Sequence, residues 1–156
     1  MKRSFLVFAV PVVALAVAAL GSSSTAATDS PVASASSTAK VELTKTKLGK
    51  VLADGSGRTL YLFEKDKGPK STCFGACATA WPPLTTTGKP KASHGVSASK
   101  LGTTSRGGGV KQVTYNGHPL YRFIKDTGAR QTHGQGLKAF GAEWYVLSAA
   151  GKQIGK

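Results

Sequence analysis

The chain has 156 residues and is strongly basic, with 21 lysines and arginines, 7 aspartates and glutamates, and a formal net charge of +14. This length accommodates one domain with one modest core. The basic residues are scattered and accompany no nucleic-acid-binding motif, which argues against specific nucleic-acid recognition and for a generally basic surface.

Residues 1–27 have the pattern of a cleaved signal peptide. Two basic residues precede an apolar run over residues 4–20, and small residues at 25–27 provide a cleavage site. The apolar run is short for a membrane anchor and is not followed by basic residues, so we expect no transmembrane segment after cleavage. No cysteine stands near the cleavage site to carry a lipid. We therefore expect a secreted, extracellular protein that is at most loosely held in the cell envelope.

Residues 28–40 are rich in serine, alanine and threonine and predict a disordered lead-in. A single β-rich domain is then expected over residues 41–156. Loss of Lys2 and Arg3 with the signal peptide lowers the net charge of the mature protein to +12. A protein with this charge should be attracted to anionic cell-wall polymers or to anionic lipid head groups.

One short pattern, Tyr-x-Phe-x-x-Asp, occurs twice with a spacing of sixty residues. Its members are Tyr61, Phe63 and Asp66 in the first copy and Tyr121, Phe123 and Asp126 in the second. Because side chains alternate along a strand, the Tyr and the Phe of each copy should share one face. Each Asp should accept backbone N–H groups of a turn in which Gly68 or Gly128 takes a positive φ. A ligand-binding cleft lined by the Tyr hydroxyls and the carboxylates remains an alternative.

Short strand patterns surround both copies of the motif and indicate an internal duplication. They fall at residues 41–46, 50–53 and 58–64 of the first half and at 100–105, 110–115, 118–124 and 143–148 of the second. Asn116-Gly117 between two of these runs is a strong hairpin signal. Residues 85–98, rich in Thr, Lys and Pro, predict a long exposed connection between the halves.

The predicted fold class is all-β or β-rich. Two related antiparallel meanders, about residues 41–84 and 99–150, should form a sandwich or a small barrel, with one short helix near residues 75–81. Trp81 and Trp144 follow the two motifs at similar distances, and we expect both to anchor the core.

Cys73 and Cys77 are the only cysteines, and in an exported protein they should form a structural disulfide. Three residues separate them, whereas a dithiol redox motif normally has two. The histidines, at 94, 118 and 133, lack the spacing of zinc-finger or haem-attachment ligands, so no metal site is predicted. A redox or metal-handling protein that uses this cysteine pair remains an alternative function.

Enzyme signatures are largely absent, with no Gly-x-Ser-x-Gly, P-loop, His-Glu-x-x-His or dinucleotide fingerprint. Asp66 and Asp126 could act as a carboxylate pair in an unrecognised hydrolase only if they faced each other across a cleft. We therefore predict no catalytic residue and no cofactor. The leading interpretation is a secreted, non-catalytic binding or structural protein of the cell envelope, of unknown ligand.

The doubled Tyr-x-Phe-x-x-Asp pattern is accompanied, after its first copy, by Cys-x-x-x-Cys-Ala-x-x-Trp-Pro-Pro. Together they resemble a family of bacterial secreted-repeat proteins, which are predicted lipoproteins of unknown function. The resemblance covers roughly residues 41–150 and implies an exported, envelope-associated protein without an established catalytic activity. This chain differs from the lipoprotein members because it lacks a cysteine at the cleavage site.

Overall fold

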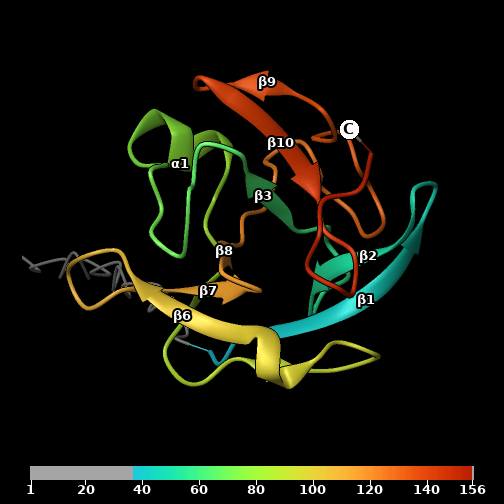
Figure 1. Cartoon of the computed structure of the whole chain (residues 1–156), viewed down its shortest axis with the longest axis horizontal. Coiled ribbons are helices and arrows are strands. Elements are labelled where there is room, and N and C mark those ends of the chain that lie inside the picture. The colour runs from blue at the N-terminus through green and yellow to red at the C-terminus, as the bar shows by residue number, and fades with distance from the viewer. Residues whose placement is uncertain (1–36, 156) are drawn as a thin grey trace, which may run out of the picture. The chain divides into compact units, whose positions relative to one another are not determined.

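The computed structural model describes residues 37–155 (Figure 1). The predicted signal peptide and most of the predicted lead-in lie outside these residues. No helix within residues 37–155 is long and apolar enough to cross a membrane. The elements are β1 (Lys40–Thr46), β2 (Gly49–Asp54), β3 (Tyr61–Phe63), α1 (Ala76–Ala80), β4 (Thr85–Thr86), β5 (Lys91–Ala92), the 3-10 helix η1 (Ala98–Lys100), β6 (Leu101–Ser105), β7 (Lys111–Tyr115), β8 (His118–Pro119), β9 (Lys138–Ala139) and β10 (Ala142–Val146).

Within residues 37–155 the prediction of a strand-rich, mainly antiparallel fold with one short α-helix is confirmed. In the first repeat β1 pairs antiparallel with β2, and in the second β6 pairs antiparallel with β7, which in turn pairs with β8. The turn between β7 and β8 is the predicted hairpin, with Asn116 at φ 50° and Gly117 at φ 79°. Positive φ at both central residues is the geometry that matches the twist of two-residue hairpins.

The last strand of each repeat joins the sheet of the other repeat. At the end of the first repeat, β4 pairs with β7, and the Leu84 N–H donates to the Leu120 carbonyl at 2.9 Å. At the end of the second repeat, β10 pairs with β3, and the Leu147 carbonyl accepts from the Leu52 N–H at 2.9 Å. The two repeats are thus interlaced, and Figure 1 shows β10 of the second repeat running beside β3 of the first.

Residues 85–98 connect the two repeats and are mostly exposed or half-buried, as the sequence predicted, but they are not without regular structure. They contain β4 and also β5, which pairs parallel with β1, and both Thr86 and Pro90 are buried. Two-residue strands are too short to produce a periodic pattern, so they could not be predicted from the sequence.

The two motif strands meet at the centre of the domain. The Tyr61 N–H donates to the Tyr121 carbonyl at 2.8 Å, and the Tyr121 N–H donates to the Tyr61 carbonyl at 3.0 Å. The pair is reciprocal, so each motif strand makes the same backbone contact with the other. Both tyrosines are completely buried.

Alternation along the motif strands divides the interior into two clusters. The aliphatic cluster contains mainly Leu and Val, including Leu60, Leu62 and Leu120. The aromatic cluster lies on the opposite face of the motif strands and contains Val51, Tyr61, Phe63, Cys73, Cys77, Trp81, Tyr121, Phe123, Trp144 and Val146. The Tyr and the Phe of each motif therefore lie on the same face of their strand, as predicted, and this face lines the aromatic cluster.

The turn at the end of each motif differs from its prediction. The Asp66 N–H donates to the Phe63 carbonyl and the Asp126 N–H to the Phe123 carbonyl, each at 3.0 Å. These turns close at the Asp, upstream of the glycines, so Gly68 and Gly128 do not need the positive φ predicted for them and do not have it.

Candidate functional site

Four rings of the aromatic cluster form a continuous stack. Trp81 and Trp144 are nearly parallel, with centroids 3.9 Å apart and planes at 2°. Phe123 stacks on Trp81 at 4.3 Å, and Phe63 stacks on Trp144 at 4.1 Å. Each repeat contributes one Trp and one Phe, and both tryptophans are buried in the core.

The motif tyrosines contact this stack with their ring edges. Tyr61 lies against Trp81 with centroids 5.3 Å apart, and Tyr121 lies against Trp144 at 5.2 Å. Edge-to-face contacts of this kind add roughly 0.5–1.5 kcal/mol per pair beyond the area that is buried. Removing either indole would therefore disturb the packing of both repeats.

Each motif tyrosine is bonded to the aspartate of the opposite motif. The Tyr61 hydroxyl donates to Asp126 Oδ2 at 2.5 Å, and the Tyr121 hydroxyl donates to Asp66 Oδ2 at 2.6 Å. Burial, reinforced by the carboxylate, raises the pKa of both tyrosines well above the ordinary value. Both phenols are therefore protonated at neutral pH and act as hydrogen-bond donors.

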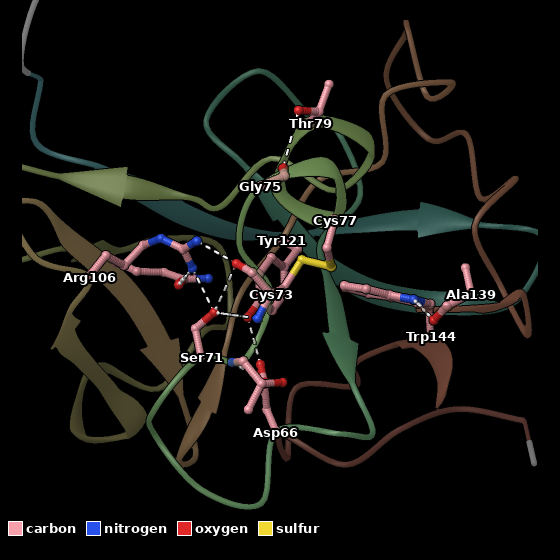
Figure 2. Close-up of a disulfide and its surroundings, with 12 residues drawn as sticks. Asp66, Ser71, Cys73, Gly75, Cys77, Thr79, Arg106, Tyr121, Ala139 and Trp144 are labelled. Carbon is pink, nitrogen blue, oxygen red and sulfur yellow. Dashed lines mark hydrogen bonds between the residues drawn. A yellow bond between two sulfur atoms is a disulfide. The ribbon is translucent and has the colours of Figure 1, made fainter. Parts of the chain in front are cut away.

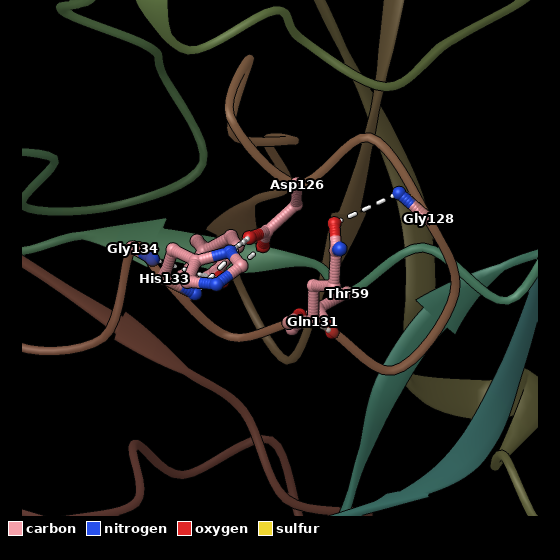
Figure 3. Close-up of polar contacts among 7 residues, drawn as sticks. Thr59, Asp126, Gly128, Gln131, His133 and Gly134 are labelled. Atoms are coloured by element: carbon pink, nitrogen blue, oxygen red, sulfur yellow. Dashed lines mark hydrogen bonds and ion pairs between the residues drawn. The ribbon is translucent and has the colours of Figure 1, made fainter.

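The second oxygen of each carboxylate holds the loop that follows it. Asp66 Oδ1 accepts from the N–H and the hydroxyl of Thr72, both at 2.7 Å. Asp126 Oδ1 accepts from the His133 N–H at 3.0 Å and lies 3.0 Å from its Nδ1, as Figure 3 shows. The aspartates do accept backbone N–H groups, but from residues six and seven positions ahead. The sequence contains no signal for the crossed tyrosine bonds.

The predicted disulfide is present and lies against the aromatic cluster. Cys73 and Cys77 are bonded with Cα atoms 5.2 Å apart, at the start of α1, and both are buried (Figure 2). A residue that the sequence analysis missed, Arg106, holds this loop. Its guanidinium donates to Ser71 Oγ at 2.6 Å and to the Cys73 carbonyl, and lies 4.4 Å from the centroid of the Phe74 ring.

A surface groove of about 530 Å³ lies where the loop after the first motif faces the β7–β8 turn. Burial lowers the pKa of His118 in this groove, although the Asp66 carboxylate opposes the shift. The imidazole is therefore neutral at physiological pH. Within residues 37–155 no group of three or more His, Cys, Asp and Glu side chains could hold a metal ion. The groove is lined by Leu62, Phe63, Glu64, Asp66, Lys67, Gly68, Pro69, Asn116, Gly117, His118 and Gln153.

Acidic side chains are withdrawn from the surface in the described part of the chain, whereas lysines cover it. No acidic residue within 37–155 is exposed, because Asp54, Asp66 and Asp126 are buried and Glu42, Glu64 and Glu143 are half-buried. The exposed lysines are Lys40, Lys45, Lys47, Lys50, Lys65, Lys67, Lys70, Lys89, Lys91, Lys111, Lys125, Lys138 and Lys152.

Asp54 is an example of such a buried acidic side chain. Its Oδ2 lies 2.6 Å from Nε of Arg122 and 3.3 Å from Nη2 of Arg58. Burial by itself would raise the pKa of Asp54, but the hydrogen bond and charge of Arg122 outweigh it and leave the pKa below its usual value. The carboxylate is thus neutralised inside the fold and contributes little negative potential at the surface.

Comparison with known proteins identifies the family of this chain. Residues 42–85 and 102–148 match a family model described as a secreted repeat of unknown function, and the two matches span the two interlaced repeats. No curated protein and no solved structure matches the chain significantly. Because the two matches cover more than half of its length, the chain belongs to this family of secreted repeats of unknown function.

Proposed function

We propose that this protein is a secreted, non-catalytic adhesion protein that binds anionic polymers of the cell envelope through its lysine-covered surface. The observation that carries the proposal is the separation of charge: lysines are exposed while every acidic side chain within residues 37–155 is buried or half-buried. A surface of one sign attracts polyanions and speeds their association. The net charge alone would not give such a surface if acids and bases alternated on it.

The β1–β2 hairpin presents three of these lysines close together. Lys45 and Lys50 are direct cross-strand partners, both exposed, and Lys47 lies in the turn between them. Like charges placed directly opposite each other destabilise a strand pair. A bound polyanion would relieve this repulsion, so the hairpin gains more from such a ligand than an isolated lysine does.

A non-catalytic role is supported by the way the motif carboxylates are used. Each has one oxygen bonded to a buried tyrosine and the other to the loop that follows it. Neither is therefore free to act as a general acid or base on a bound substrate without breaking the contacts that hold the two repeats together. This is why we favour adhesion over the hydrolase alternative.

The test is sedimentation of the mature protein with isolated cell walls that contain teichoic acid, over a range of salt concentrations. Binding should weaken steeply between about 0.05 and 0.5 M salt, because the Debye length falls from over 10 Å to a few ångströms. A triple variant, Lys45→Gln, Lys47→Gln, Lys50→Gln, should bind more weakly than the charge-matched triple variant Lys125→Gln, Lys138→Gln, Lys152→Gln. Binding that is indifferent to salt would show that the proposal is wrong.

A further inference from the structure

The aromatic cluster brings together the side chains that are most easily oxidised by one electron. Two indoles form a parallel stack at 3.9 Å, and a phenol contacts each of them at 5.2–5.3 Å. Indoles and phenols lose an electron more readily than other aromatic side chains. Contact between the rings allows an electron to pass from a neighbouring ring to the oxidised one. All four rings are buried. The adhesion proposed above uses none of them.

We propose that the aromatic cluster is a one-electron relay, in which the stacked tryptophan pair receives an oxidising equivalent and passes it to a buried tyrosine whose proton moves to the bonded aspartate. The oxidant is a diffusible one-electron oxidant of the extracellular medium, of the radical class. The relay would confine oxidative damage to a site where the proton has a defined acceptor.

The step balances within the cluster. The external radical takes one electron from the Trp81–Trp144 pair and leaves an indole radical cation. Tyr121 then returns one electron to the indole while its hydroxyl proton crosses the 2.6 Å bond to Asp66. The products are a neutral indole, a neutral phenoxyl radical and a protonated carboxyl group. The external radical is reduced by one electron, and no proton leaves the protein.

The carboxylate is what makes this step favourable. A phenol that loses an electron becomes a strong acid, so its oxidation is easy only where a base lies within hydrogen-bond reach. Burial and the neighbouring carboxylate raise the pKa of Tyr61 and Tyr121, so both phenols are protonated before oxidation and must release a proton as well as an electron. The short bonds to Asp126 and Asp66 provide the path.

The two tyrosine–aspartate pairs differ in whether the transferred proton can move on from the aspartate. Asp126 is also in contact with Nδ1 of His133, whose side chain is 62% exposed, so a proton arriving at Asp126 has a route toward solvent. Asp66 is held instead by Thr72, whose hydroxyl and N–H both already donate to it. The tyrosyl radical should therefore live longer on Tyr61 than on Tyr121.

The remaining tyrosines are matched controls. The Tyr115 hydroxyl donates to the Ala149 carbonyl, which is not a base, and its ring lies in the aliphatic cluster. The Tyr145 hydroxyl donates to Glu143, but its ring also lies in the aliphatic cluster, on the other face of the strand from Trp144. Tyr115 lacks both a base and contact with the tryptophan stack, whereas Tyr145 has a base and lacks only the contact with the stack.

The experiment is pulse radiolysis of the mature protein with the azide radical, which oxidises indoles, followed by optical and electron paramagnetic resonance detection. In the wild-type protein the indole radical should convert to a tyrosyl radical. The double variant Tyr61→Phe, Tyr121→Phe should lengthen the lifetime of the indole radical at least tenfold. Tyr115→Phe and Tyr145→Phe should leave the conversion unchanged.

Phenylalanine preserves the ring packing, and circular dichroism identifies any variant that fails to fold. As a second approach, Asp126→Asn keeps a polar partner for Tyr61 but removes the base, and should lower the yield of the Tyr61 radical several-fold in a Tyr121→Phe background. The proposal is overturned if the wild-type indole radical decays without forming a tyrosyl radical. It is equally overturned if Tyr115→Phe or Tyr145→Phe abolishes the conversion, or if neither the double variant nor the Asn variant changes it.

Discussion

Replacing Asp126 with Asn should destabilise the protein more than replacing Asp66 with Asn, although the two residues occupy equivalent positions in the repeats. Asn keeps one carbonyl oxygen and places an N–H donor where the second carboxylate oxygen was. In both loops the carbonyl is required by a backbone N–H, that of Thr72 or His133. The new amide N–H of the Asn then faces the tyrosine hydroxyl. The tyrosine oxygen must accept the hydrogen bond from this amide, and its own O–H must find a different acceptor.

The two tyrosines differ in whether they have another acceptor. The Tyr121 hydroxyl lies 2.6 Å from Ser71 Oγ and can donate to it, in competition with the Arg106 guanidinium that donates to the same oxygen. The other hydrogen-bond neighbour of the Tyr61 hydroxyl within residues 37–155 is the Gly134 N–H at 3.3 Å, which is itself a donor. In the Asp126→Asn variant the buried hydroxyl of Tyr61 therefore has no acceptor for its proton.

The expected difference follows from the cost of an unsatisfied buried group. Both variants exchange a charged acceptor for a neutral one, at about 1 kcal/mol each. Asp126→Asn adds the loss of the hydroxyl's acceptor, about 2 kcal/mol within the usual range of 1–3 kcal/mol. A difference of about 2 kcal/mol corresponds to about 1 M in the urea midpoint and about 8 °C in Tm for a domain of this size.

The assay is reversible urea unfolding followed by the fluorescence of Trp81 and Trp144, which lie in the same cluster. Both variants remove one negative charge, so effects of net charge cancel when they are compared. In a Tyr61→Phe background the extra cost of Asp126→Asn should shrink, because the hydroxyl that lacks an acceptor is gone. Equal urea midpoints for the two Asn variants, or a less stable Asp66→Asn, would refute the reasoning.

Three further predictions concern the same core. Raising the pH above 10.0, the ordinary tyrosine pKa, should lower the free energy of unfolding, because the unfolded chain ionises Tyr61 and Tyr121 while the raised pKa keeps them neutral in the fold. Urea titrations at about pH 9 and 11 measure the slope, which a Tyr61→Phe, Tyr121→Phe variant should lose in large part, the rest coming from Tyr145, whose pKa is also raised. Gly134→Ala should cost about 1–3 kcal/mol, since its Cβ would lie 2.7 Å from Cη2 of Trp81, whereas Gly128→Ala has no contact closer than 3.6 Å and should be nearly neutral. Equal urea midpoints for these two Ala variants would contradict that placement. The double variant Cys73→Ser, Cys77→Ser should lower the free energy of unfolding by only about 2 kcal/mol in urea titrations, because a disulfide that closes a very short loop restricts the unfolded chain little. If the double variant is completely unfolded, or is as stable as the wild-type protein, the view that the disulfide only fixes its own loop is wrong.

Local periodicity predicted the strand interior well. Alternation placed Tyr61 and Phe63 on one face and Leu60 and Leu62 on the other, and these faces line the two clusters of the core. This succeeds because the direction of a side chain on a strand depends only on its position along the strand. The hairpin at Asn116-Gly117 was predictable for a similar reason, since two-residue turns have narrow conformational requirements.

What the sequence could not predict is the exchange of strands between repeats. Whether β4 adds to its own meander or to the other one depends on long-range pairing, which leaves no trace in spacing along the chain. The crossed tyrosine–aspartate bonds depend on the same choice. Arg122 shows the same limit: it takes the position of Leu62 in the second motif, and it is aimed at Asp54 in the hairpin of the first repeat.

The exchange has a consequence for the repeat as a structural unit. A lone copy would lack the strand that completes its sheet, the aspartate that accepts from its tyrosine, and the tyrosine that donates to its aspartate. Leaving these buried groups unpaired costs several kcal/mol, a large part of the stability of a small domain. A repeat of this kind can satisfy its own motif only with a second copy, which this chain supplies through a tandem duplication. The Tyr, Phe and Asp therefore need the same spacing within both copies of the motif, because each copy provides the hydrogen-bond partners of the other.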